Sequence, residues 1–147
     1  MKTLIIGSGE VGISLWRVLG KEYDCPIIDV EGGWEGHQFD IIHICFPYND
    51  KETFVAAVRG YQEKYSPKYV VIHSTTPVGV SRECGATHSM IIGQHPRLEE
   101  GIRTFPKFLA GPQASEIADY FRRAGLKVII FDKQETGEAA KLFLTEH

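Results

Sequence analysis

The chain has 147 residues, the size of one domain, and at this length about 70% of the unfolded chain's surface can be buried on folding. Hydrophobic residues make up 43% of the sequence and charged residues 24%, an ordinary globular composition that argues against disorder. The formal net charge of -3 at pH 7 gives no broad basic field, so a nucleic acid is not expected as a partner. The expected partner is a small molecule.

The cysteines form neither an even disulfide set nor a zinc-ligand pattern. They are Cys25, Cys45 and Cys84. His88 and His95 follow the last of them, but their spacing matches no common metal site, so no metal is expected. The longest apolar runs, at residues 69–72 and 128–131, are far too short to cross a membrane. Because the sequence also opens directly on an apolar strand with no signal segment, we expect a cytoplasmic protein without a membrane partner.

An apolar strand at residues 2–6 runs into a G-x-G-x-x-G turn at the head of a periodic helix. The turn consists of Gly7, Ser8, Gly9, Glu10, Val11 and Gly12. This order is typical of dinucleotide binding, because Gly7 makes the tight turn, Gly9 admits the diphosphate and Gly12 lets the helix pack closely on the strand. The phosphates then lie at the helix N-terminus, with the Glu10 side chain directed away from them. The alternative is that the glycines serve only a tight strand-to-helix turn.

An acidic residue follows the second expected strand. Asp29 comes directly after the apolar run at residues 26–28, about twenty positions beyond the glycines. In dinucleotide-binding folds a carboxylate at this place accepts hydrogen bonds from the adenosine ribose. The same charge would repel the extra phosphate of NADP, so the expected cofactor is NAD rather than NADP.

Strands and helices continue to alternate along the rest of the chain. The expected strands are residues 40–46, 68–73, 89–92, 108–110 and 127–131, and the expected helices are residues 54–65, 117–124 and 136–144. Asn49 or Asp50 can cap the first of these helices, and the charged segment 95–107 is expected to be irregular. This alternation predicts an α/β Rossmann fold, a doubly wound and mainly parallel sheet, in a single domain of residues 1–147.

A polar loop with proline and glycine follows the fourth strand at residues 74–79, at the edge where sheets of this type bind ligands. Taken together, the motifs resemble the N-terminal domain of the UDP-glucose/GDP-mannose dehydrogenase family, within the wider 6-phosphogluconate and β-hydroxyacid dehydrogenase group. The resemblance spans almost the whole chain. It rests on residues 7–12, 44–47, 74–79 and 135–141.

The resemblance implies roles for individual residues at the ligand edge. Phe46 and Pro47 lie by the cofactor, Ser74 lies close to it, and Thr75 lies near the nicotinamide and the reacting carbon. Lys141 matches the family's active-site lysine, which stabilises negative charge on the substrate oxygen. Without the resemblance, a lysine on the polar side of a C-terminal helix is expected to be merely solvated.

The sequence also departs from the family. Thr145 stands where the family has an asparagine, and Arg97 stands where it has a carboxylate, unless Glu99 or Glu100 replaces that group after a shift. Family members continue into a second domain that supplies a thiol nucleophile, for which we expect no counterpart in this sequence. Cys84 is the only thiol near the ligand edge, and no base lies next to it in the sequence.

Three functions are compatible with these features. We favour an NAD(H)-binding domain that lacks full dehydrogenase activity by itself. The alternative is a small NAD-dependent oxidoreductase in which Thr75 and Lys141 act on a hydroxyl-bearing substrate and a homo-oligomer completes the site. A regulatory protein that responds to NADH is the third, and the sequence offers no partner motif for it.

Overall fold

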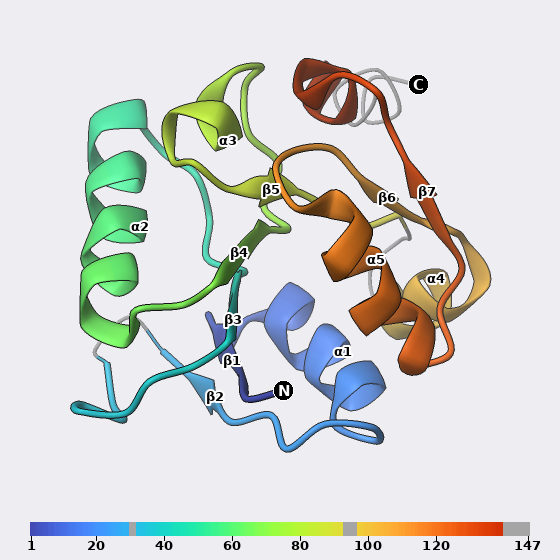
Figure 1. The fold of residues 1–147 in the computed structure, drawn as a ribbon, viewed down its shortest axis with the longest axis horizontal. Coiled ribbons are helices and arrows are strands. Elements are labelled where there is room, and N and C mark those ends of the chain that lie inside the picture. Colours follow the sequence, from blue (N-terminus) through green and yellow to red (C-terminus); the bar gives the residue numbers. More distant parts are fainter. Residues whose placement is uncertain (30–31, 93–96, 140–147) are drawn as a thin grey trace.

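The computed structural model describes residues 1–29, 32–92 and 97–139 (Figure 1). Its main sheet has five strands in the order β2-β1-β3-β4-β5, and every neighbouring pair is parallel. The strands are β1 (Thr3–Ile6), β2 (Ile27–Ile28), β3 (Ile41–Ile44), β4 (Tyr69–Ile72) and β5 (Thr87–His88). The mainly parallel sheet expected from the sequence is confirmed.

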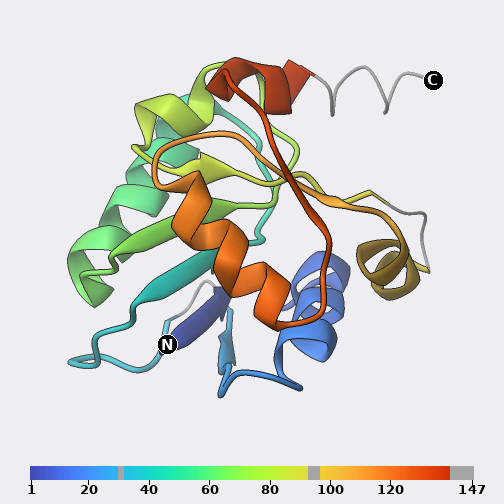
Figure 2. The ribbon, with the colours of Figure 1, turned by 45° about the vertical axis from the view of Figure 1, so that its right-hand side comes forward.

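Helices cover both faces of this sheet (Figures 1 and 2). One face carries α1 (Glu10–Leu19), α4 (Leu98–Thr104) and α5 (Ala114–Arg123), and the other carries α2 (Lys51–Tyr65) and α3 (Val80–Glu83). Two more strands, β6 (Lys107–Leu109) and β7 (Val128–Ile130), pair in parallel with each other. An antiparallel bridge between His88 and Ala110 joins them to β5. The architecture is therefore doubly wound, as expected.

Each face of the sheet has its own apolar core. Ile5 of β1 packs with Leu15 and Phe121 on the face of α1 and α5, and Leu4 packs with Phe54 on the face of α2. Every residue of β1, β3 and β4 is buried. Burial of a whole strand, apart from Thr3 and His43 almost entirely apolar, is typical of parallel strands that are covered on both sides.

The ends of α2 follow from local sequence. Of the two expected caps, Asp50 is the one used, because its carboxylate accepts a hydrogen bond of 2.9 Å from the Thr53 backbone N–H. The helix ends at Ser66, which has a φ of 45°, and Pro67 follows it. A proline disfavours the helical conformation in the residue before it, so the helix stops there.

Two expectations about the middle of the chain are wrong. The strand expected at residues 89–92 lies instead at Thr87–His88, and just beyond it the Lys107 ammonium binds the carbonyl oxygens of Ser89 and Met90. The segment expected to be irregular contains α4, whose Leu98 and Ile102 are buried one helical turn apart. The short helix α3 was not expected at all.

The last expected helix is partly described. Residues 134–139 are helical, two positions earlier than expected, while its continuation to residue 144 lies outside the described residues. In the part of the chain that the structure describes, no helix combines the length and apolarity needed to span a membrane.

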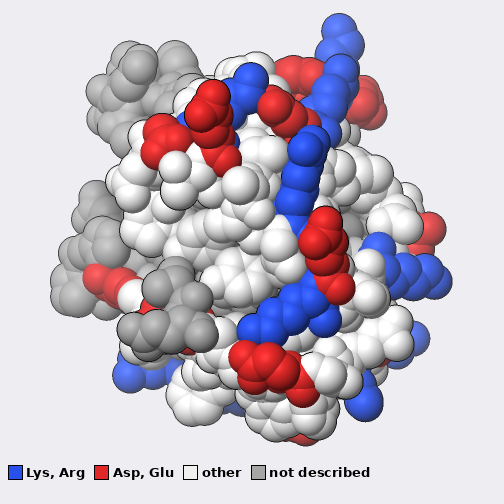
Figure 3. Space-filling model, turned by 90° about the vertical axis from the view of Figure 1, so that its left-hand side faces the viewer, with Lys and Arg blue, Asp and Glu red and all other residues white. Residues whose placement is uncertain are grey.

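The face covered by α2 and α3 carries side chains of both signs (Figure 3). Its ion pairs join Lys51 to Glu83, Lys64 to Glu35 and Arg82 to Glu135, at 2.9, 2.8 and 2.7 Å. Exposed pairs of this kind add little stability, but they neutralise the surface locally.

Candidate functional site at the carboxyl edge of the sheet

The chain leaves β1 on one side of the sheet and β3 on the other. From β1 it passes through α1 to β2, whereas β3 continues through α2 to β4 on the opposite face. The carboxyl ends of β1 and β3 therefore form a switch point, the place where open parallel sheets bind ligands.

Gly7 and Gly12 close the turn after β1 tightly. Gly7 has a φ of +117°, and a Cβ built on it would lie 2.8 Å from the backbone of Cys45 and Phe46 at the end of β3. A Cβ on Gly12 would lie 1.8 Å from the Gly7 carbonyl oxygen. Both positions exclude a side chain, so the start of α1 packs directly against the turn.

Gly9 differs from these two glycines because it faces open space. A Cβ built on it would meet no described atom within 4 Å beyond its chain neighbours. Gly9 is also the N-cap of α1, and as a glycine it offers no side chain to cap that helix end. The first-turn N–H groups and the positive end of the helix dipole therefore border an open space, an arrangement suited to an anion.

Asp29 lies beside this turn. It follows β2, and its carboxylate accepts a hydrogen bond of 2.9 Å from the Ser8 hydroxyl. The turn and β2 are also joined through the backbone, since the Gly7 N–H donates to the Ile28 carbonyl oxygen at 2.8 Å. The glycine turn and the acidic residue, 20 or so positions apart in sequence, are thus neighbours in space.

A pocket of about 370 Å³ lies between the end of β3 and α2. It is lined by Phe46, Pro47, Asn49, Asp50, Thr53, Phe54, Ala57 and Tyr61. The Phe46 ring centroid lies 5.3 Å from that of Phe54 and 5.9 Å from that of Tyr61. Burial raises the pKa of Tyr61, with smaller contributions from nearby charged and ionisable groups. A flat aromatic ring would find apolar walls there.

The loop after β4 completes the edge. The Ser74 hydroxyl donates a hydrogen bond of 2.6 Å to the Phe46 carbonyl oxygen and so ties the ends of β3 and β4 together. Thr75, the next residue, is exposed. The structure therefore brings the glycine turn, Asp29, Phe46, Ser74 and Thr75 to one edge of the sheet.

Glu138 holds the loop after β4 in place through hydrogen bonds, a role that the sequence did not predict. Its side chain is fully buried, and its carboxylate accepts hydrogen bonds from the Thr76 hydroxyl at 2.8 Å, the Gly79 N–H at 3.0 Å and the Ser81 N–H at 3.1 Å. Gln134 adds a bond of 3.0 Å to the Ser81 hydroxyl. The only sequence signal was the position of Glu138 inside the family-like segment 135–141.

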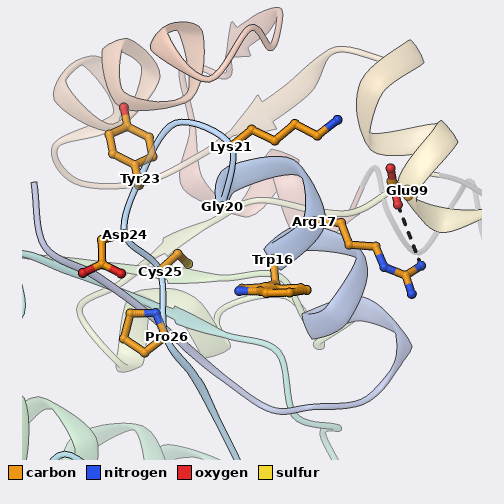
Figure 4. Close-up of a pocket in the computed structure, with 9 residues that line it drawn as sticks. All are labelled: Trp16, Arg17, Gly20, Lys21, Tyr23, Asp24, Cys25, Pro26 and Glu99. Carbon is orange, nitrogen blue, oxygen red and sulfur yellow. Dashed lines mark ion pairs between the residues drawn. The ribbon is translucent and has the colours of Figure 1, made fainter.

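Other expected site residues lie elsewhere. Lys141 falls outside the described residues. Glu99 forms ion pairs with Arg17 at 3.8 Å and Arg103 at 3.3 Å, and it lines a pocket of about 580 Å³ at the C-terminal end of α1 (Figure 4). That end of α1 is opposite the glycine turn.

The cysteines are all buried free thiols. Burial raises the pKa of Cys25 and of Cys45 to about 12 and that of Cys84 to about 11. A nucleophilic thiolate is therefore disfavoured at neutral pH, as the sequence indicated. Among the described residues, no group of three or more His, Cys, Asp or Glu side chains is arranged to hold a metal ion.

Comparison with known proteins identifies the fold. No protein-family model matches the chain, and no curated protein matches it closely enough to count as a relative. Among solved structures, a UDP-D-ManNAc dehydrogenase from Pyrococcus horikoshii superposes with a TM-score of 0.79 at 15% sequence identity, covering 98% of this chain and 50% of that one. A ternary complex of GDP-mannose dehydrogenase from Pseudomonas aeruginosa gives 0.76 at 13% identity, covering 99% and 49%.

A third similar structure, the 3-hydroxyisobutyrate dehydrogenase from Mycobacterium tuberculosis, gives a TM-score of 0.74 at 16% identity, covering 98% of this chain and 59% of that one. The fold is thus the Rossmann fold found in nucleotide-sugar and hydroxyacid dehydrogenases, and the fold that the resemblance implied is confirmed. The chain spans about half the length of the nucleotide-sugar dehydrogenases that it matches.

Proposed function

We propose that the protein is an NAD(H)-binding domain, similar to the cofactor half of nucleotide-sugar dehydrogenases and lacking complete dehydrogenase activity by itself. The observation that supports this most is the contrast among the three glycines. Gly7 and Gly12 are closed against backbone, whereas Gly9, the N-cap of α1, has open space on the side where a Cβ would lie. A turn that served only to reverse the chain would not require open space beside Gly9.

The residues of the carboxyl edge fit the parts of the cofactor in order. The diphosphate lies against Gly9 and the first-turn N–H groups of α1, and Asp29 binds the adenosine ribose. The adenine occupies the apolar pocket beside Phe46, and the nicotinamide lies toward Ser74 and Thr75. When bound, NAD supplies a two-electron hydride acceptor at that end of the site.

The choice of NAD over NADP follows from charge. A 2′-phosphate on the ribose would come close to the Asp29 carboxylate, and like charges at such short range repel. We also propose a cytoplasmic location, because the three cysteines are unpaired thiols.

The second candidate is a small oxidoreductase acting on a hydroxyl-bearing substrate. The exposed Thr75 at the nicotinamide end supports it. Lys141 would stabilise charge on the substrate oxygen, and a second copy of the chain would complete the substrate pocket. Oxidation of hydroxy acids and nucleotide sugars, followed as NADH absorbance, separates this candidate from the binding domain.

Thermal unfolding with NADH tests the proposed function. Ligand at about a hundred times its Kd stabilises by about 2.7 kcal/mol, which for a domain of this size raises Tm by about 5–10 °C. Gly9→Val should fold normally, because its Cβ meets open space and the backbone is extended, yet it should lose the NADH shift because the side chain fills the diphosphate position.

Gly60→Ala is the matched control for that substitution. Gly60 lies on α2 and is also free of described atoms within 4 Å of a built Cβ. This variant should keep the full NADH shift. An equal shift in Gly9→Val and in the wild type would remove the proposed site, and no shift in the wild type would remove the proposed function.

A further inference from the structure

A chain of buried polar side chains crosses the core on the face of α1 and α5. Thr3 Oγ1 lies 2.7 Å from Tyr120 Oη, which lies 3.0 Å from His43 Nε2. His43 Nδ1 lies 2.8 Å from His73 Nε2, and His73 Nδ1 lies 2.9 Å from Lys107 Nζ. None of these five residues is more than 3% exposed.

The chemistry of the five groups allows only two directions of donation along this chain. An ammonium at Lys107 has no acceptor, so it donates to His73 Nδ1, and each later group then donates toward Thr3. If Lys107 is instead a neutral amine, the donor and acceptor roles are reversed in every hydrogen bond of the series, and the amine accepts from His73. In both directions His43 and His73 are neutral, each with one proton, and burial together with the Lys107 charge lowers the pKa of His43 to about 3.

The Lys107 end of this series of side chains lies at the ligand edge. Lys107 Nζ donates to the carbonyl oxygens of Ser89 at 3.2 Å and Met90 at 3.3 Å, just beyond β5, and His73 directly precedes Ser74. The Ser89 hydroxyl is also buried and has no hydrogen-bond partner among the described residues. A polar group without a partner at this position suits a ligand or water that enters from the edge.

The Thr3 end of the series lies at the amino edge of the sheet. Thr3, although buried, forms part of the wall of a pocket of about 580 Å³ there, together with Tyr23 and Asp24. The Tyr23 ring stacks on the Tyr120 ring with centroids 4.4 Å apart and also borders the pocket at the end of α1 (Figure 4). The chain of side chains thus connects the two opposite edges of the sheet.

Stability alone does not account for this arrangement. A buried lysine with two buried histidines costs more desolvation than apolar side chains of the same volume would, and such polar clusters are seldom net stabilising. A continuous path with one donor and one acceptor at every step is, however, what proton transfer through a protein requires.

We propose that Thr3, Tyr120, His43, His73 and Lys107 form a proton relay between the ligand edge and the amino edge of the sheet. In one passage the Lys107 ammonium gives a proton to His73 Nδ1, as the Nε2 proton of His73 moves to His43 Nδ1. The Nε2 proton of His43 moves to Tyr120, the Tyr120 proton moves to Thr3, and the Thr3 proton leaves to water. Lys107 is then a neutral amine that can accept the next proton.

The use of this relay rests on the proposed function. Oxidation of a hydroxyl by NAD moves a hydride to the nicotinamide and releases one proton, and the neutral amine of Lys107 is the group that takes it up. Only this use depends on dehydrogenase chemistry, because the relay itself can be measured in the protein without cofactor.

Two stacked tyrosines allow a controlled test by NMR on ¹⁵N-histidine-labelled protein. Tyr120→Phe removes the relay hydroxyl but keeps the ring, while Tyr23→Phe removes a hydroxyl that donates only to the Tyr120 carbonyl oxygen outside the relay. The wild type should show His43 and His73 as Nε2–H tautomers. In Tyr120→Phe the His73 ring proton should exchange with deuterated water about tenfold more slowly, because exchange must then await local opening. Tyr23→Phe should match the wild type.

Backbone amide exchange in β1 and β3, recorded in the same samples, reports the opening itself. The relay would be overturned if the His73 ring proton exchanged at the same rate in Tyr120→Phe and Tyr23→Phe. It would also be overturned if the ring-proton rate changed only in step with the amide exchange rates of β1 and β3. Lys107→Met provides a second check, since loss of the ammonium should convert His43 from one tautomer to a mixture; an unchanged tautomer would also count against it. NADH binding is measured separately, so failure of one proposal leaves the other standing.

Discussion

Stability should fall steeply in mild acid, because His43 and His73 are held neutral in the core. His43 and His73 are 0% and 2% exposed, and burial lowers the pKa of each below the ordinary value. The unfolded chain binds a proton at each histidine below a pH of about 6.5, while the folded chain does not. Stability is therefore complete above that pH and is lost as the pH falls toward the folded pKa, which for His43 is about 3.

The size of the effect follows from proton linkage. Each histidine contributes about 1.4 kcal/mol of unfolding free energy per pH unit within this window, so the pair gives a slope of about 3 kcal/mol per pH unit. A domain of this size has a total stability of about 5–15 kcal/mol. Unfolding should therefore occur close to pH 4, before most exposed carboxylates are protonated.

Urea unfolding between about pH 7 and pH 5 measures this slope. His43→Gln should reduce the slope by about 1.4 kcal/mol per pH unit, because it removes one proton that is taken up on unfolding. The same substitution at His37, an exposed histidine, is the matched control. A wild-type free energy that stays level from pH 7 to pH 5 would refute the reasoning.

Further substitutions test single contacts. Gly12→Ala should cost about 3 kcal/mol or more in urea unfolding, since its Cβ would overlap a carbonyl oxygen, whereas Gly60→Ala should gain about 0.5–1 kcal/mol; equal effects would contradict the close packing. Asp29→Ala should weaken NADH binding about tenfold in calorimetry and leave NADPH binding unchanged or stronger; an unaltered preference would remove Asp29 from the ribose site. Glu138→Gln sets an amide donor against backbone N–H groups and should cost about 2–3 kcal/mol, with faster amide exchange at residues 79–81; unaltered exchange would mean that the carboxylate does not hold this loop.

The sequence was most informative where local chemistry decides the structure. The alternation of buried strands with periodic helices predicted the sheet. The positions of Gly7 and Gly12 predicted the turn, because a close backbone approach tolerates no side chain there. Asp50 was among the expected caps, since a carboxylate just before a helix can accept a hydrogen bond from a first-turn backbone N–H, here that of Thr53.

Long-range contacts explain what the sequence could not predict. The strand after α3 was misplaced, and the side chain that binds the carbonyl oxygens beyond it, Lys107, is some 18 residues away in sequence. Glu138 and the buried histidines look like surface or strand residues in isolation, and only the fold brings Glu138 to Thr76 or His43 to His73. Such pairings carry no local periodicity or spacing signal.

A crystal structure of the protein with NADH tests the central claim most directly. The diphosphate oxygens should lie within hydrogen-bonding distance of the first-turn N–H groups of α1, against Gly9, with the adenosine ribose on the Asp29 carboxylate. A nucleotide bound away from Gly9, or protein side chains filling that space at saturating NADH, would contradict the account.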